Sequence, residues 1–262
     1  MIPKGLFYRI NLYCGCVVLV CIFLPLLELV TSSSADVLLK TVKDRDVINS
    51  IRLSLIASGI SAFIVFVFGT PLAYLMARFN FLGKRLVEAV IDLPVVIPHP
   101  VVGIAVLGVV GRDHIIGKIL LDAGIRIMGS VTGIVIVLTF VSFPFYINTV
   151  RDGFEAVSPR LENVSRSLGA SMASTFLRVT LPLSWRSVVA GLIMSGARAI
   201  SEFGAVVVIA YHPVTAPVLI YERFESYGLR YSQPVAVLLV GVCMVLFIVV
   251  RWITLKNNND FD

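Results

Sequence analysis

Long apolar runs separated by short polar connections make up most of this chain. Five charge-free stretches approach or exceed the roughly 18 residues that predict a membrane-spanning helix, at 10–27, 53–77, 93–111, 127–150 and 231–250. A sixth apolar region carries two charges, Arg198 and Glu202. The pattern predicts an all-α, polytopic membrane protein with six transmembrane helices, at about 10–30, 50–77, 88–111, 128–150, 187–211 and 232–252.

Composition also indicates a lipid environment. Hydrophobic residues make up 58% of the chain and charged residues 15%, with a mean hydropathy of +0.94. An ordinary soluble domain has about 25% charged residues. No Pro-, Gly- or Ser-rich linker separates a soluble module from the apolar stretches. We therefore expect one membrane domain covering 1–262, surrounded by the lipid bilayer.

The distribution of basic residues predicts how the helices are oriented, because cytoplasmic loops carry an excess of Lys and Arg. With the N-terminus inside, the inner segments hold twelve basic residues: Lys4, Arg9, Arg78, Lys84, Arg85, Arg151, Arg160, Arg166, Arg178, Arg186, Arg251 and Lys256. The outer segments hold eight: Lys40, Lys43, Arg45, Arg112, Lys118, Arg126, Arg223 and Arg230. The sequence therefore predicts an N-in/C-in topology. This topology explains the formal net charge of +6 without a nucleic-acid partner.

The longest predicted cytoplasmic segment, 151–186, lies between the fourth and fifth transmembrane helices. Ser158 and Pro159 favour a helix start, because a serine hydroxyl caps a free N–H and proline fits the first helical position. A short apolar stripe then recurs at helical spacing. Its members are Leu161, Val164 and Leu168.

Gly169 is expected to end this first helix, and Ser171 to start a second one that carries Phe176. Leu181 and Pro182 are expected to stop the second helix before Ser184 opens the fifth transmembrane helix. Two short amphipathic helices at a membrane surface have two interpretations. They form a docking element for a partner protein, or they lie as a hairpin on the lipid headgroups.

The stretch LENVSRSLGAS, followed by TFLRVTLP, resembles the EAA loop of ABC-importer permeases, the coupling helix that docks in a groove of the ATPase subunit. The matching residues are Leu168, Gly169, Ala170, Ser171, Thr175, Phe176, Val179, Thr180, Leu181 and Pro182. The chain departs from the motif at its start, where Asn163 occupies the glutamate position and the nearest acid is Glu162. The resemblance implies ATPase-coupling roles for Glu162, Asn163, Leu168, Gly169, Ala170, Ser171, Phe176 and Pro182.

Other stretches narrow the resemblance. SGARAISEFGAVVVIA at 195–210 and TAPVLIYERF at 215–224 resemble the fifth helix and the next outer loop of permeases for molybdate, tungstate, sulfate and thiosulfate. LPVVIPHPVVGIAVLG at 93–108 is similar to the third helix of the same family. Overall length and the TAPVLIY stretch favour the molybdate/tungstate branch. A sulfate/thiosulfate permease is the alternative.

The resemblance also implies partners. Permeases of this kind form a homodimer in the cell (plasma) membrane, with the pathway on the two-fold axis. Two ABC ATPase subunits bind beneath the homodimer, and an extracytoplasmic oxyanion-binding protein delivers the cargo. ATP and Mg²⁺ then belong to the ATPase. The chain itself is expected to bind no cofactor and to catalyse no reaction.

Charges and prolines inside two predicted helices point to pathway residues. Arg198 and Glu202 stand i and i+4 on one helix face, where a lone charge would cost roughly 2.5–3.5 kcal/mol. This pair either locks helices together or faces the pathway. Prolines in the third helix remove backbone donors and produce either a simple kink or a hinge in the pathway wall. The candidate pathway or gate residues are Arg198, Glu202, Phe203, Gly204, Pro98 and Pro100.

Other patterns do not support a second function. GRDHIIGK at 111–118 has five residues between its glycines, where a phosphate-binding loop has four. His99, His114 and His212 lack partners at metal-ligand spacing, so we expect no metal site. The sequence also lacks a recognisable catalytic constellation. The competing classes are a secondary transporter or channel without an ATPase, and a membrane-bound assembly factor or receptor.

Overall fold

The computed structural model describes residues 5–112 and 114–256, and every regular element within these residues is a helix. The all-α expectation is confirmed over this part of the chain. The longer helices are α1 (Leu6–Thr31), α3 (Arg45–Arg78), α4 (Lys84–Val96), α5 (His99–Val110), α7 (Val131–Ala156), α11 (Trp185–Ile200), α13 (Ala216–Tyr227) and α14 (Leu229–Lys256). The shorter ones are α2 (Ala35–Val42), α6 (Ile115–Asp122), α8 (Pro159–Ser167), α9 (Met172–Thr175), the π-helix η1 (Phe176–Thr180), α10 (Leu181–Leu183) and α12 (Gly204–Ile209).

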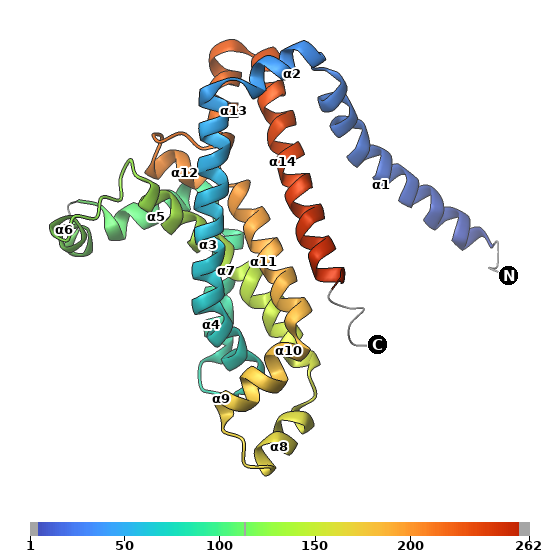
Figure 1. Ribbon diagram of the computed structural model, residues 1–262, viewed down its shortest axis with the longest axis vertical. Coiled ribbons are helices and arrows are strands. Elements are labelled where there is room, and N and C mark those ends of the chain that lie inside the picture. The colour runs from blue at the N-terminus through green and yellow to red at the C-terminus, as the bar shows by residue number, and fades with distance from the viewer. Residues whose placement is uncertain (1–4, 113, 257–262) are drawn as a thin grey trace.

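Helices α3, α7 and α11 pack against one another and form the core of the molecule (Figure 1). Small residues allow their backbones to approach closely. A side chain at Gly69 of α3 would meet the Tyr146 ring of α7 at 2.8 Å. One at Gly153 of α7 would collide with Ser187 of α11. Packing through small residues is typical of helices in lipid, where the hydrophobic effect does not drive helices together.

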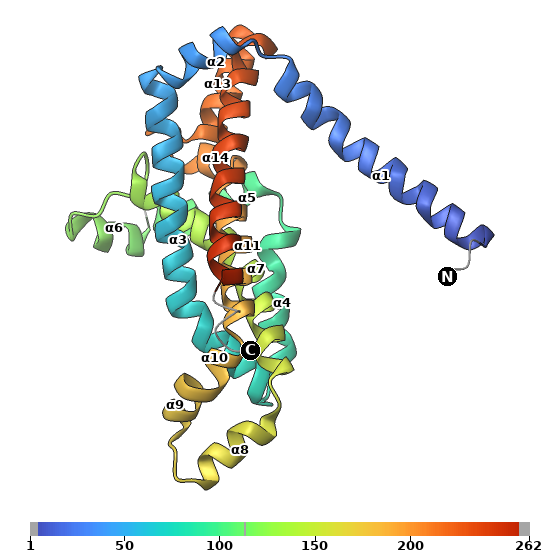
Figure 2. The same ribbon diagram turned by 45° about the vertical axis from the view of Figure 1, so that its right-hand side comes forward.

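Different connections form the two ends of the bundle (Figures 1 and 2). At one end lie α2, which contacts α14, and α13, whose Arg223 donates to the Asp44 carboxylate, just before α3, at 2.6 Å. At the other end α8, α9 and α10 form a loop that projects beyond the ends of α3 and α7. The predicted cytoplasmic segment 151–186 therefore lies at the same end as the turn between α3 and α4. The orientation of this end relative to a bilayer stays a prediction.

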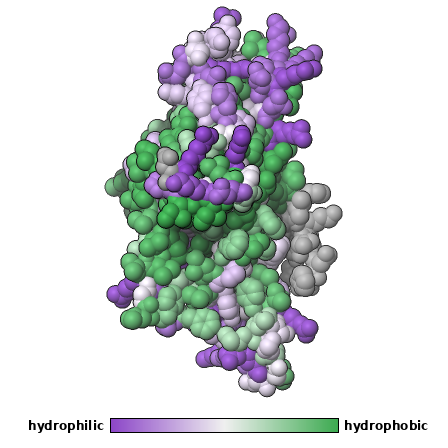
Figure 3. Space-filling model, turned by 90° about the vertical axis from the view of Figure 1, so that its left-hand side faces the viewer, coloured by the Kyte–Doolittle hydropathy of each residue, from purple (hydrophilic) through white to green (hydrophobic). Residues whose placement is uncertain are grey.

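Four helices are long and apolar enough to cross a membrane: α1, α3, α7 and the Leu229–Val250 part of α14. Two bent helix pairs raise this number to six if each pair is one span. Apolar side chains cover much of the face in Figure 3, and polar residues gather at its two ends and in a patch above its middle. The described residues therefore contain four to six candidate spans, and the predicted six is the upper limit of this range.

Helix α1 stands apart from the bundle in both ribbon views (Figures 1 and 2). None of its residues is buried within this chain. Its entire apolar surface is therefore available to lipid or to another chain.

The third predicted span, 88–111, consists of two helices. Helix α4 ends and α5 begins across a bend of 118°. The break follows from Pro98, which has no N–H to continue the hydrogen-bond ladder and forces the residue before it out of helical geometry. Ile97 accordingly has an extended backbone, with ψ at 133°. The prolines thus interrupt the helix completely and do not merely kink it.

The fifth predicted span, 187–211, is also interrupted. Helix α11 ends at Ile200 and α12 starts at Gly204. Glu202 lies in the break, and its carboxylate accepts the N–H of Ala205 at 2.8 Å. This hydrogen bond satisfies one of the N–H groups that the start of a helix leaves without a backbone partner.

The second helix of the projecting loop starts and ends close to the predicted positions. Ser171 accepts the N–H of Ser174 at 3.2 Å and caps the helix start as expected. The helix ends at Leu183, one residue after Pro182, and the chain bends by 73° at Ser184, which is the N-cap of α11. The π-helical turn η1 precedes this proline, and such turns interrupt the regular hydrogen-bond ladder that a proline would otherwise disturb.

Candidate functional site

The first loop helix presents an apolar surface to its surroundings. Helix α8 begins at Pro159 as predicted, although the Ser158 hydroxyl makes no capping hydrogen bond. The predicted stripe is exposed by 48% at Leu161, 59% at Val164 and 84% at Leu168. We call these three residues the α8 apolar face. Exposed apolar side chains that lie together mark a contact surface for protein or lipid.

The opposite side of α8 is attached to the bundle through Glu162. Its Oε1 accepts from Nε of Arg78 at 2.8 Å and from the hydroxyl of Thr180 at 2.7 Å. The Tyr74 hydroxyl approaches Oε2 at 3.4 Å. Arg78 also donates to the carbonyl of Val157 at 2.8 Å. We call Glu162, Arg78, Thr180 and Tyr74 the Glu162 network.

The Glu162 network is largely shielded from solvent. The side chains of Arg78 and Glu162 are only 9% and 11% exposed. A buried ion pair is stable when further hydrogen bonds satisfy its remaining donors and acceptors, and loss of one partner leaves an uncompensated charge. The network therefore fixes α8 and η1 to the last turn of α3.

Phe176 makes a second attachment of the loop. Its ring lies 4.8 Å from the Tyr74 ring of α3 and 5.7 Å from the Phe154 ring of α7, measured between centroids. Both pairs have edge-type geometry, which favours aromatic contacts. The predicted coupling residue Phe176 is therefore an internal packing residue that joins η1 to two core helices.

The eight predicted coupling residues differ in where they lie on the loop. Glu162 and Phe176 face the bundle and attach the loop to it. Gly169 forms the turn between α8 and α9 with φ at +91°, a backbone conformation that favours glycine. Ala170 is partly buried, and the exposed members are Asn163, Leu168, Gly169, Ser171 and Pro182.

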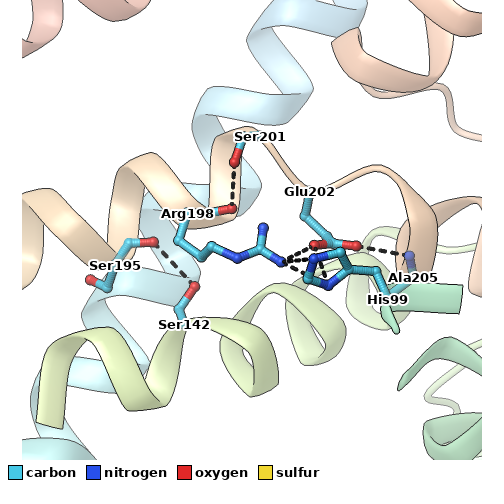
Figure 4. A network of polar contacts seen from close by, with 7 residues as sticks. All are labelled: His99, Ser142, Ser195, Arg198, Ser201, Glu202 and Ala205. Carbon is cyan, nitrogen blue, oxygen red and sulfur yellow. Dashed lines mark hydrogen bonds and ion pairs between the residues drawn. The ribbon is translucent and has the colours of Figure 1, made fainter. Parts of the chain in front are cut away.

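A second polar site lies at the breaks in the two interrupted helices (Figure 4). Nη2 of Arg198 lies 2.6 Å from Oε2 of Glu202 and 2.9 Å from Nδ1 of His99. His99 Nδ1 lies 3.5 Å from the same carboxylate oxygen. The Arg198 guanidinium also lies 6.0 Å from the centre of the Phe145 ring. We call Arg198, Glu202 and His99 the Arg198 cluster.

The remaining pathway candidates surround the Arg198 cluster. Pro98 precedes α5, and Pro100 lies in its first turn. A Cβ at Gly204 would lie 3.0 Å from Cβ of His99 and 3.2 Å from Cδ of Pro100. The Phe203 ring stacks at a tilt on Tyr221 of α13, with 4.8 Å between centroids. The structure therefore brings all six predicted pathway candidates together where α5 meets α12.

Three members of these sites, Arg78, Tyr74 and His99, were not predicted from the sequence. Arg78 was counted only as a basic residue at the inner end of the second helix. A single sequence has no signal that pairs it with Glu162, which is 84 positions away. His99 was set aside because it lacks metal-ligand spacing. The sequence shows only its place between two prolines, which does not indicate its contact with Arg198, 99 positions away.

The described residues contain no group of three or more His, Cys, Asp or Glu side chains able to hold a metal ion. The contacts that the structure shows in the two sites are hydrogen bonds and ion pairs. The Glu162 network attaches a loop to the core, and the Arg198 cluster joins two helix breaks.

Sequence comparison identifies relatives of this chain. Residues 69–256 match the family described as the inner membrane component of binding-protein-dependent transport systems. The molybdate/tungstate transport system permease protein WtpB of Pyrococcus abyssi is 44% identical over 241 residues, which are 91% of this chain and 92% of that protein. The same-named protein of Pyrococcus furiosus is 45% identical over 238 residues, 90% of each chain. A probable sulfate transport system permease protein of Chlorokybus atmophyticus is 33% identical over 194 residues, 72% of this chain and 68% of that protein.

Solved transporters have a similar fold. A chain of a bacterial ABC transporter involved in import of the acidic polysaccharide alginate aligns with a TM-score of 0.77 at 17% identity, covering 97% of this chain and 96% of that one. At this identity the likeness concerns the fold alone. The family match includes most of the chain, and the two Pyrococcus relatives align with about nine-tenths of it. This chain therefore belongs to the family of inner membrane components of binding-protein-dependent transport systems, which are multi-pass membrane proteins.

Proposed function

We propose that this chain is the permease subunit of an ATP-driven importer for molybdate and tungstate. Relatives with that name share 44% and 45% identity with it over about nine-tenths of its length. The observation that carries the transport mechanism is the projecting loop, which exposes the α8 apolar face and is attached internally through the Glu162 network. A loop that only rested on lipid would not need a buried ion pair to the core.

In this proposal the α8 apolar face docks on an ABC ATPase subunit. Two copies of the chain form the pathway, and each copy binds one ATPase. ATP closes the ATPase pair and moves the loop. The Glu162 network transmits the movement to α3, and Phe176 transmits it to α7. ATP and Mg²⁺ belong to the ATPase, and this chain binds neither of them.

The pathway or gate lies at the two helix breaks. Arg198, Glu202, Phe203, Gly204, Pro98 and Pro100 form the region that rearranges between the inward-open and outward-open states. Broken helices at membrane depth are tolerated only beside protein or water, which supports a place in the pathway wall. We propose six spans with both termini inside, with α4 and α5 forming the third span and α11 and α12 the fifth. An extracytoplasmic binding protein delivers the oxyanion at the α2–α13 end.

Sulfate transport is the second candidate, because a relative named as a sulfate permease also matches the chain. That relative is 33% identical over 72% of the chain, which is less than the 44% identity over 91% of the chain for the molybdate/tungstate relative from Pyrococcus abyssi. This difference favours molybdate and tungstate as the cargo.

Transport by the reconstituted system tests the proposal. The purified chain is placed in proteoliposomes with its ATPase and its binding protein, and uptake of labelled tungstate is measured with ATP on the ATPase side. We expect uptake that requires both partners and is reduced by equimolar molybdate but not by a hundredfold excess of sulfate. Equal competition by sulfate would favour the second candidate. Uptake without ATP would contradict the proposal in favour of a secondary transporter.

A further inference from the structure

We propose that the Arg198 cluster is a transient binding site for the transported oxyanion. The proposal rests on the function above and assigns the substrate to named side chains. Its starting point is an asymmetry between donors and acceptors. The Glu202 side chain is 1% exposed, whereas Arg198 is 16% exposed and His99 is 46% exposed. The negative group is buried, and the two groups that can donate hydrogen bonds are more exposed than it is.

Both carboxylate oxygens of Glu202 are already engaged. Oε1 accepts the N–H of Ala205 at 2.8 Å, and Oε2 faces Arg198 at 2.6 Å. Glu202 therefore acts as a fixed counter-ion that also stabilises the start of α12.

Arg198 has hydrogen-bond donors that its contacts in the cluster do not use. Its contacts to Glu202 and His99 all use Nη2. Nε and Nη1 have no hydrogen-bond partner among the residues that the structure describes. A guanidinium presents its donors in a planar fork that fits the oxygens of a tetrahedral oxyanion. The exposed His99 ring lies beside this fork, so a ligand at Arg198 would also meet an imidazole from α5.

The charge of the Arg198 cluster favours weak and reversible binding. With a neutral imidazole, the arginine and the glutamate sum to zero, so a dianion meets hydrogen-bond donors without a strong net positive field. A transport site must bind its cargo weakly, because cargo that is held tightly does not leave. The donors also come from two interrupted helices, α5 and α11. A rearrangement at the breaks would separate them and release the ion.

Binding of labelled tungstate to the detergent-purified permease–ATPase complex, without the binding protein, tests this site by equilibrium dialysis. Glu202→Gln removes the counter-charge and keeps the side-chain shape, and we expect tungstate to bind about tenfold more tightly. Arg198→Gln combined with Glu202→Gln leaves no unpaired buried charge, and we expect binding to fall at least tenfold. Arg52→Gln removes an exposed arginine outside the cluster and is expected to bind like the wild type.

A purely structural role predicts a different result. The double variant removes both charges of the Arg198–Glu202 ion pair, so it would then bind tungstate and import it like the wild type. That result would overturn the site, as would the absence of tungstate binding by a wild-type complex that imports it. Failure of the wild-type transporter to import any oxyanion contradicts the proposed function itself. The two failures are therefore distinguishable.

Discussion

Nε of Arg78, in the last turn of α3, lies 2.8 Å from Oε1 of Glu162, in the first turn of α8. Both side chains are largely buried, and Thr180 of η1 donates to the same oxygen. The ion pair joins the projecting loop to the longest core helix. It is therefore the most direct physical connection through which movement of the loop would reach α3.

Glu162→Gln tests this connection. Glutamine keeps the shape of the side chain but removes the charge, so the ion pair to Arg78 becomes a weaker hydrogen bond. We expect ATP hydrolysis to continue while tungstate uptake falls about tenfold, measured as ions imported per ATP hydrolysed. The matched control is Glu155→Gln, at an exposed acid on the same end of the bundle. An unchanged ratio in Glu162→Gln would show that the network does not transmit force.

Leu168→Glu tests the docking surface. Leu168 is 84% exposed, so a charge there changes the free energy of unfolding by at most about 0.5 kcal/mol. We expect association with the ATPase to be lost in co-purification, because a charge enters an apolar contact. Leu82→Glu is the control, since Leu82 is fully exposed in the turn before α4. Retained association of the ATPase with the Leu168→Glu variant would contradict docking through α8.

Gly103→Ala tests the contact between the two interrupted helices. A Cβ at Gly103 of α5 would lie 2.8 Å from the carbonyl oxygen of Ala205 in α12. Overpacking against backbone costs about 1–3 kcal/mol, so we expect a lower melting temperature and reduced uptake. Gly108 lies on the same helix with no neighbour within 4 Å, and Gly108→Ala is expected to be neutral or slightly stabilising. Equal melting temperatures for the two variants would show that the close contact between α5 and α12 does not contribute to the stability of the fold.

The ion pair at the other end predicts a pH effect. The hydrogen bond from Arg223 is the main reason why the pKa of Asp44 lies below its ordinary value of 3.8. An acid with a lowered pKa stabilises the folded state above its unfolded pKa, and this stabilisation is lost as pH falls through the folded pKa. The melting temperature of the wild type should therefore exceed that of Asp44→Asn at neutral pH. The difference should begin to shrink as pH falls through 3.8 and disappear once pH is below the lowered pKa of Asp44 in the folded state.

The control for the pH effect is Arg223→Gln, which removes the other partner of the same ion pair. Its melting temperature should follow the Asp44→Asn variant across the pH range. A difference between the wild type and Asp44→Asn that persists well below pH 3.8 would assign the effect to another group.

The spacing of apolar residues and the positions of glycine, serine and proline predicted the local structure well. Apolar runs identified the helical character of the chain, and Gly169 and Ser171 identified the turn between α8 and α9. These features depend on neighbouring residues, so a single sequence contains them. Leu181 and Pro182 likewise marked the helix end, which lies at Leu183.

Long-range relationships were harder to predict. Arg198 and Glu202 are four positions apart, so their pairing followed from helix geometry. His99 lies beside this pair because a 118° bend turns α5 toward α12. Arg78 and Glu162 meet only because α3 and α7 end at the same level. Such contacts arise from tertiary packing, which no local pattern records.

A photoreactive benzoyl-phenylalanine at position 168 tests the coupling proposal most directly. The full transporter carrying this residue in place of Leu168 is irradiated in native membranes, with and without ATP, and its cross-linked products are identified. We predict a covalent adduct with the ATPase subunit whose yield changes on addition of ATP. Cross-linking to lipid alone, with the ATPase present in the same membranes, would contradict the proposal that this loop couples ATP hydrolysis to transport.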